Sequence, residues 1–112
     1  TMPFAVLIIS YTSGPAELFA CDLRDISQAQ IIGTASAGVG TMQELFALED
    51  GGAVLLTVAL VEPRGGEQAV YDKVGITPTV EVTLASGDDS NLLLLTGEQD
   101  NQLSTAMNML AA

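Results

Sequence analysis

The sequence predicts an α/β fold, and three observations support that class. An almost wholly apolar run, Phe4–Ile9, precedes a polar turn and a segment with apolar residues at helical spacing. A second short apolar segment, Gln30–Gly33, leads into the glycine-rich loop Thr34–Gly40. Strand, helix and strand in this order form a βαβ-type unit, whose two loops lie at the carboxyl ends of the strands. Ligands of open α/β sheets bind at that edge, so we expect any functional site there.

The first strand and helix follow from local patterns. Met2–Ser10 is expected to be a strand buried on both faces, because its apolar run is continuous rather than alternating. Gly14 suits the N-cap of the next helix, Pro15 its first position and Glu17 its capping box. This helix should end near residues 26–28, and its predicted buried face carries Ala16, Phe19, Ala20 and Leu23.

A long β-hairpin is expected in the middle of the chain. Thr41–Leu48 is predicted to be its first strand and Ala53–Glu62 its second. The turn between them is Glu49–Gly52, because an acidic pair followed by two glycines accepts positive φ. After a further turn at Pro63–Gly66, the segment Thr79–Leu84 predicts another short strand.

The remaining expectations are two irregular segments and a final helix. Two segments, residues 67–73 and 86–91, are expected to be irregular. A final helix is predicted over Asn101–Leu110, with Asp100 as its N-cap. The apolar residues of its predicted buried face are Leu103, Ala106, Met107 and Leu110.

Length and composition indicate one domain with a modest core. The chain has 112 residues, of which 48% are hydrophobic and 15% are charged. No run reaches the roughly 20 apolar residues of a membrane-spanning helix, so no membrane insertion is expected. The surplus apolar surface should meet another chain or a part of a longer protein, of which this sequence looks like a piece. We therefore predict self-association through a strand edge or an apolar face.

The net charge of −11 excludes one class of partner. It results from 14 acidic residues against Arg24, Arg64 and Lys73. Nucleic acid is not expected to bind, since phosphate binding needs a basic surface, and anionic membranes are disfavoured for the same reason. The adjacent pairs Glu49-Asp50 and Asp88-Asp89 do not lie in an EF-hand pattern, so no metal site is predicted.

The residue types also limit the possible chemistry. The chain contains no histidine, which removes Ser-His-Asp and Cys-His arrangements and most zinc sites within it. Cys21 is the single cysteine, so no internal disulfide is possible, and we interpret it as a small buried hydrophobe. No cofactor is expected.

Six stretches follow one another in an order that is specific as a series. They are Phe4–Glu17, Ile31–Gln43, Asp50–Thr57, Pro63–Gly66, Gly75–Val82 and Asp100–Leu110. This order resembles the C-terminal part of the catalytic core of the tail-specific, or C-terminal-processing, serine peptidases, the S41 family. The resemblance covers nearly all of the chain. It implies a crotonase/ClpP-like ββα core fragment, with a mixed sheet, helices and a long β-hairpin.

The resemblance also implies a domain organisation and a setting. Residues 1–112 would be a single domain, the C-terminal portion of a peptidase core without its N-terminal strands and without a PDZ domain that presents substrate tails. The partner would be a peptide or a protein C-terminal segment. The chain carries no address of its own, and the resemblance points to the bacterial cell envelope or export.

The catalytic dyad of the family falls on two unreactive residues here. Family members use a serine nucleophile three positions before the glutamate of the turn and a lysine base in a Gly-Lys-Gly loop. These positions are Gly14 and Val39 in this sequence, and their separation fits the family pattern. Glycine offers no nucleophile and valine accepts no proton, so the resemblance implies a serine peptidase fold without its dyad. Glu17 is retained, and Gln43 stands where the family keeps a glutamine near the dyad.

Two serines are alternative candidates for a nucleophile. Ser13 lies beside Gly14, but neither lysine nor histidine is near in sequence to activate it, and the single lysine is Lys73. The competing interpretation of Ser13 is a turn or cap hydroxyl. Ser36, in the glycine loop, has the same two interpretations. Gln43 is either an oxyanion donor or a polar residue of a strand.

Three functions therefore stay open from the sequence. The first is a non-hydrolysing domain that binds peptide, with the backbone amides of Gly14, Gly38 and Gly40 as candidates to bind a carbonyl or carboxylate. The second is an active serine peptidase that uses Ser13 or residues outside this chain. The third is a structural oligomerisation module.

Overall fold

The computed structural model describes residues 2–65, 71–85 and 93–112. Its elements, in chain order, are β1 (Ala5–Ile8), α1 (Pro15–Ser27), β2 (Gln30–Gly33), β3 (Thr41–Ala47), β4 (Ala53–Leu60), β5 (Val80–Glu81) and α2 (Asn101–Ala111). The irregular segment expected over residues 86–91 lies outside the described residues, as does most of the one over 67–73.

The predicted parallel sheet is present: β2 has the predicted bounds, whereas β1 and β5 are shorter than expected. The expectation that the first strand is buried on both faces was wrong, since Leu7 is 39% exposed. β1, β2 and β5 pair in parallel in the order β1-β2-β5. β1 pairs with all four residues of β2, whereas β5 pairs with only two of them, Ile32 and Gly33. A side chain at Gly33 would lie 1.9 Å from the Ile8 carbonyl oxygen, so only glycine lets these two backbones approach. The α/β class is confirmed, with parallel and antiparallel pairs in separate sheets.

Helix α1 begins and ends as predicted, but its buried face is rotated. Pro15 occupies the first turn, and Gln28 closes the helix in the left-handed region at φ 55°. Ala20 and Cys21 join the core with Ile8 and Ile31, as expected for Ala20 and for the cysteine. The prediction was wrong for Ala16 and Phe19, which are both exposed, because the sheet meets the face that carries residues 17, 20 and 21.

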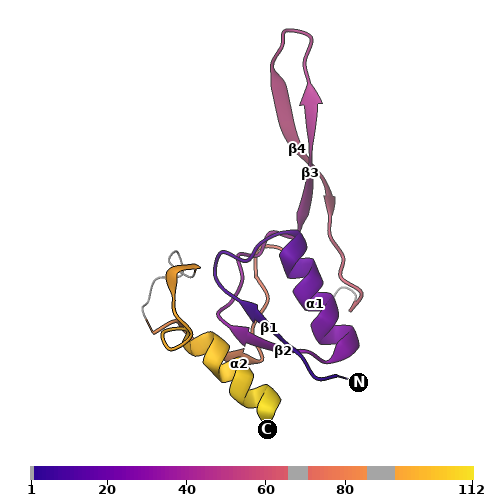
Figure 1. Cartoon of the computed structure of the whole chain (residues 1–112). Helices are drawn as coiled ribbons and strands as arrows, with labels where there is room; N and C mark the ends of the chain where they lie inside the picture. The colour runs from indigo at the N-terminus through magenta and orange to yellow at the C-terminus, as the bar shows by residue number, and fades with distance from the viewer. Residues whose placement is uncertain (1, 66–70, 86–92) are drawn as a thin grey trace.

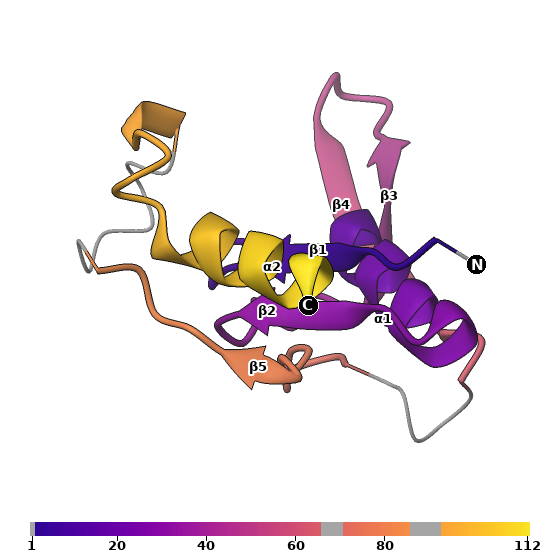
Figure 2. The ribbon, with the colours of Figure 1, turned by 60° about the horizontal axis from the view of Figure 1, so that its bottom comes forward.

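Helix α2 lies across β1 and β2 (Figure 2). Its N-cap is confirmed, since the Asp100 carboxylate accepts a hydrogen bond from the Leu103 amide at 2.9 Å. Of the predicted apolar face, only Ala106 is buried. Gln102 is buried beside it because its side-chain amide donates to the Val82 carbonyl at 2.7 Å. Neither helix of the described chain has the length and apolar content to cross a bilayer.

The predicted hairpin is confirmed and projects from the body of the molecule (Figure 1). β3 and β4 pair antiparallel from Thr41 opposite Leu60 to Ala47 opposite Ala53. The turn closes as Leu48 donates its amide to the Gly52 carbonyl at 2.8 Å. No residue of either strand is buried. The hairpin therefore forms a two-stranded sheet apart from the core, a unit that is marginally stable when isolated in water.

Candidate functional site

A sharp strand-to-helix turn lies at the carboxyl end of β1, with Gly14 at its corner. Gly14 has φ 61° and ψ −127°, a combination that a residue with a side chain rarely adopts. Its carbonyl accepts hydrogen bonds from the Glu17 and Leu18 amides, which start α1. Nothing lies within 4 Å of where a Cβ of residue 14 would stand. A side chain at this corner would thus project into open space, as the nucleophile of a nucleophile elbow does.

The carboxylate of Glu17 joins this turn to the glycine loop. Glu17 is fully buried, and its Oε2 accepts hydrogen bonds from the Gly14 amide at 2.9 Å and the Val39 amide at 2.8 Å. Its Oε1 accepts from the Gly38 amide at 2.7 Å and from the Ser36 hydroxyl. The bond from Gly14 confirms the predicted capping role. One oxygen atom thus holds the backbones of Gly14 and Val39 together, so the structure places these two predicted positions side by side.

A second backbone segment, residues 73–76, holds the glycine loop in place by hydrogen bonds. The Ser36 hydroxyl accepts a hydrogen bond from the Ile76 amide at 2.7 Å, and the Lys73 amide donates to the Gly38 carbonyl at 2.7 Å. A Cβ at Gly75 would lie 2.4 Å from the Ser36 carbonyl oxygen, so the two segments are in backbone contact. Ser36 is buried and fully engaged in this contact, which supports its interpretation as a structural loop residue.

The glycine amides predicted to bind a carbonyl or carboxylate already have partners. Gly14 and Gly38 donate to the carboxylate of Glu17, and Gly40 donates to the Asp72 carboxylate at 3.1 Å. Each amide has one hydrogen, which leaves none of the three free for a ligand. The two carboxylates also oppose the approach of a negative group. This arrangement argues against an oxyanion or carboxylate site at these glycines.

A cavity of about 290 Å³ lies beside Gly14 and the first residues of β3. Its walls come from α1, the glycine loop, the base of the hairpin and the segment that follows the hairpin. No charged side chain lines it, and Ser13 is exposed outside it. The lining residues are Gly14, Pro15, Leu18, Val39, Thr41, Met42, Gln43, Val61 and Tyr71. The structure thus brings Gly14, Val39 and Gln43 together around one largely apolar cavity.

Tyr71 is a residue of this site that the sequence did not reveal. It is almost fully buried, lines the cavity, and its hydroxyl donates to the Gly14 carbonyl at 3.4 Å. Burial raises the pKa of Tyr71, and the negative charge of Glu17 raises it further. The phenol therefore stays protonated and able to donate at neutral pH. Tyr71 and Asp72 fall in a polar stretch without periodicity, so only the long-range contacts identify them.

The other reactive groups of the described chain do not form a second catalytic centre. Burial raises the pKa of the Cys21 thiol to about 11, so this cysteine stays protonated and unreactive at neutral pH. Its neighbour Arg24 pairs with Asp25 at 2.7 Å. Within the described ranges, no three His, Cys, Asp or Glu side chains are placed to hold a metal ion.

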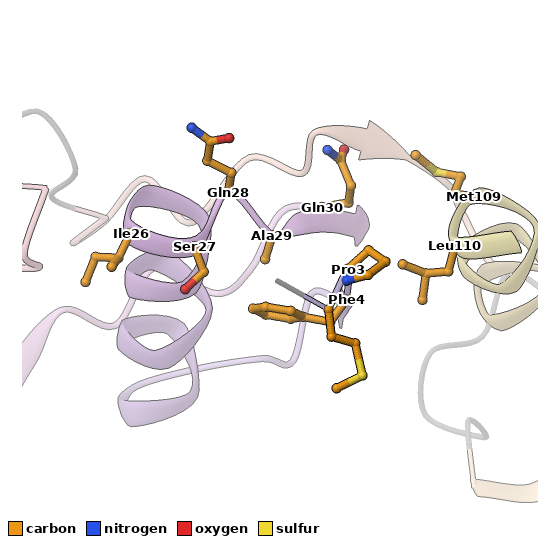
Figure 3. A pocket seen from close by; sticks show the side chains of 10 residues that line it. Pro3, Phe4, Ile26, Ser27, Gln28, Ala29, Gln30, Met109 and Leu110 are labelled. Atoms are coloured by element: carbon orange, nitrogen blue, oxygen red, sulfur yellow. The ribbon is translucent and has the colours of Figure 1, made fainter. Parts of the chain in front are cut away.

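A larger cavity of about 730 Å³ lies at the opposite edge of the sheet (Figure 3). Phe4, Ala29 and Leu110 are among its lining residues, where β1 begins, β2 begins and α2 ends. No ionisable side chain lines it, and it is remote from Gly14 and Val39. Its position at the amino ends of the strands is not where α/β sheets bind their ligands.

Comparison with known proteins agrees with this geometry. The model of peptidase family S41 matches residues 1–82. The chain is 37% identical over 76 residues to carboxyl-terminal-processing peptidase 2, chloroplastic, of Arabidopsis thaliana, a match that covers 68% of this chain and 14% of that protein. It is 32% identical over 117 residues to carboxy-terminal processing protease CtpA of Bacillus subtilis, covering 100% of this chain and 25% of that protein.

A solved structure shows the same relationship. The photosystem II D1 C-terminal processing protease superposes with a TM-score of 0.62 at 30% identity, over 73% of this chain and 21% of that one. The tricorn protease shares the fold, with a TM-score of 0.66 at 21% identity. The chain thus spans about a seventh to a quarter of the length of its curated relatives. By sequence and by fold, this chain belongs to peptidase family S41.

Proposed function

We propose that this S41 domain binds an apolar segment of a peptide or protein without hydrolysing it. The observation that carries the proposal is the cavity at the strand-to-helix corner. Gly14 and Val39 donate their amides to one carboxylate oxygen there, but Gly14 has no side chain and the side chain of Val39 is unreactive. Residues 1–112 act in this proposal as a single domain.

The loss of hydrolysis follows from three positions. Gly14 supplies no nucleophile and Val39 no base, and losing both groups of such a unit costs on the order of a millionfold in rate. In a nucleophile elbow, the amide of the next residue also donates to the oxyanion. That residue is Pro15, which has no N–H. A missing oxyanion donor costs a further factor of about 10²–10³.

Binding in the same place follows from the cavity wall. Leu18, Met42 and Val61 offer apolar surface there, and about 290 Å³ is enough for one large aliphatic side chain. Burying such a side chain stabilises a complex by about 1.5–3 kcal/mol. The relatives are named for processing carboxyl termini. We extend that partner class to this chain, as a C-terminal segment held by an apolar side chain rather than by its terminal carboxylate, because the amides nearby are occupied.

The binding proposal is tested with an unstructured peptide that carries one leucine, labelled for fluorescence anisotropy. Met42→Gln should weaken binding about tenfold, because it puts an amide into the apolar wall. Met107→Gln is the matched control: Met107 is 62% exposed and Met42 59%, but Met107 lies on α2, away from the cavity. A peptide with a C-terminal amide should bind as tightly as the free acid. An equal loss of peptide affinity in Met42→Gln and Met107→Gln would contradict binding in this cavity.

Hydrolysis is followed in the same samples by mass spectrometry. We expect intact peptide after prolonged incubation with the unaltered chain. Cleavage that disappears in Ser13→Ala would reject the proposal and favour an active peptidase built on the exposed serine. Self-association, the third function, has support of its own in the apolar hairpin, and it is compatible with binding.

A further inference from the structure

Two carboxylates contact the backbone that lines the cavity beside Gly14. The Glu17 carboxylate accepts hydrogen bonds from the amides of Gly14 and Val39, and both of these residues line the cavity. The Asp72 carboxylate accepts a hydrogen bond from the amide of Gly40, the residue after Val39, at 3.1 Å. Neither carboxylate is part of the cavity wall. The cavity thus has an uncharged lining with negative charge next to it.

A third carboxylate lies one helical turn along α1. Asp22 follows the lining residue Leu18 by four positions, so the two side chains lie on one face of the helix. The Tyr71 hydroxyl responds to all three carboxylates. Burial raises the pKa of Tyr71, and the negative charges of Glu17, Asp22 and Asp72 raise it further. Because Tyr71 lines the cavity, the electrostatic potential in the cavity is negative.

The basic residues do not offset this charge at the cavity. Among the residues that the structure describes, no positively charged side chain lines it. Arg24 pairs with Asp25 at 2.7 Å, and Arg64 and Lys73 are exposed. The whole chain has the same sign of charge, with 14 acidic residues against three basic ones. A positively charged ligand is therefore attracted to this part of the molecule, and an acidic ligand is repelled.

We infer that the segment bound in this cavity carries a lysine or an arginine beside its apolar anchor. This inference rests on the proposed function and adds the charge of the partner to it. The apolar side chain enters the uncharged cavity, and the basic side chain stays at its mouth. A lysine or arginine suits this place, because its alkyl stem can lie on apolar surface while its charged end remains in water. An acidic neighbour of the anchor is repelled by Glu17, Asp22 and Asp72.

The first test compares three labelled peptides that each contain one leucine. They are identical except for the two residues that flank the leucine, which are both lysine, both glutamine or both glutamate. Both ends are capped, so that terminal charges do not contribute. Measured by fluorescence anisotropy in about 0.1 M salt, the lysine peptide should bind about fivefold more tightly than the glutamate peptide. In 1 M salt the preference should fall below about twofold, because the Debye length shrinks to about 3 Å.

The second test removes charge next to the cavity. Asp22→Asn combined with Asp72→Asn removes two charges and keeps the oxygen atoms that accept the amides of Arg64 and Gly40. The fivefold preference for the lysine peptide should fall to about twofold. The result is the ratio of two affinities for the same variant, so a general loss of affinity does not change it.

The matched control removes the same number of charges far from the cavity. Glu49→Gln combined with Asp50→Asn acts in the turn between β3 and β4, at the end of the hairpin that points away from the body (Figure 1). Because a strand rises about 3.4 Å per residue, β3 sets this turn about 20 Å beyond Thr41, which is about two Debye lengths in 0.1 M salt. This control should keep the fivefold preference.

The outcomes separate this inference from the proposed function. Equal affinities of the lysine and glutamate peptides, with Met42→Gln still weakening the glutamine peptide, would overturn this inference alone. A lysine peptide that binds Met42→Gln as tightly as the unaltered chain would also overturn it, because charge without an anchor would explain the binding. An equal loss of preference in both paired variants would assign the selectivity to net charge and overturn it as well. If neither the lysine nor the glutamine peptide bound, both proposals would be rejected.

Discussion

The turn at Gly14 and the β3–β4 hairpin are two ways of building exposed structure in one small domain. The turn is held by a buried carboxylate that accepts four hydrogen bonds from residues 14, 36, 38 and 39. The hairpin has regular backbone pairing but no buried side chain. Order therefore has different sources in the two regions. Long-range polar contacts stabilise the site. The hairpin is stabilised by the backbone hydrogen bonds between β3 and β4.

The largest expected effect is the loss of Glu17. Glu17→Ala removes the acceptor of three amides and one hydroxyl, of which the Gly38 amide and the Ser36 hydroxyl are buried, and each unsatisfied buried group costs about 1–3 kcal/mol. We expect the free energy of unfolding in urea to fall by at least about 3 kcal/mol, or the chain to be unfolded outright. The control is Glu44→Ala, an exposed glutamate of the hairpin, which should change stability by less than about 0.5 kcal/mol. Similar losses in both variants would mean that the carboxylate does not hold the site.

A smaller effect tests whether the rigid turn still has catalytic geometry. Gly14→Ser with Val39→Lys restores the two reactive groups, and position 14 has open space for the serine. We expect little turnover of an unstructured protein substrate, because Pro15 still withholds an oxyanion donor. Adding Pro15→Ala should raise the rate by a factor of about 10²–10³. Turnover by the double replacement that Pro15→Ala does not increase would show that the oxyanion is stabilised elsewhere.

Contacts between residues close in sequence were predictable, whereas contacts between distant residues were not. The start of α1, the hairpin and the Asp100 cap each depend on residues a few positions apart, and all three are confirmed. Periodicity identified Ala20 and Ala106 but misplaced the rest of each buried helix face, because the docking of each helix on a short sheet decides which face is covered. Glu17 was predicted as a cap. Its bonds to the glycine loop join residues about 20 positions apart, and no local pattern encodes them.

Resemblance supplied what local patterns lacked at the site. It singled out Gly14 and Val39, which composition and periodicity would have passed over as a turn glycine and a loop valine. The structure places both on one oxygen of Glu17. The occupancy of the amides of Gly38 and Gly40 was not predictable, since the partner of Gly40 is Asp72, far along the chain.

The smallest expected effect concerns the hydroxyl of Tyr71. Tyr71→Phe keeps the ring in the core and removes one long hydrogen bond to the Gly14 carbonyl, so stability at neutral pH should fall by about 0.5–1.5 kcal/mol. The variant should also change the pH dependence. Burial raises the pKa of Tyr71 above its ordinary value of 10.0, so the folded chain keeps this proton when the unfolded chain loses it.

The contribution of this proton is fully present below pH 10 and declines as the pH rises through the folded pKa. The unaltered chain should therefore lose stability above pH 10 more steeply than Tyr71→Phe does, as measured by urea unfolding at several pH values. Tyr11, which is 68% exposed, supplies the control, because Tyr11→Phe should leave the pH profile unchanged. If the stability of Tyr71→Phe fell as steeply with pH as that of the unaltered chain, water would reach the Tyr71 hydroxyl through the cavity beside Gly14.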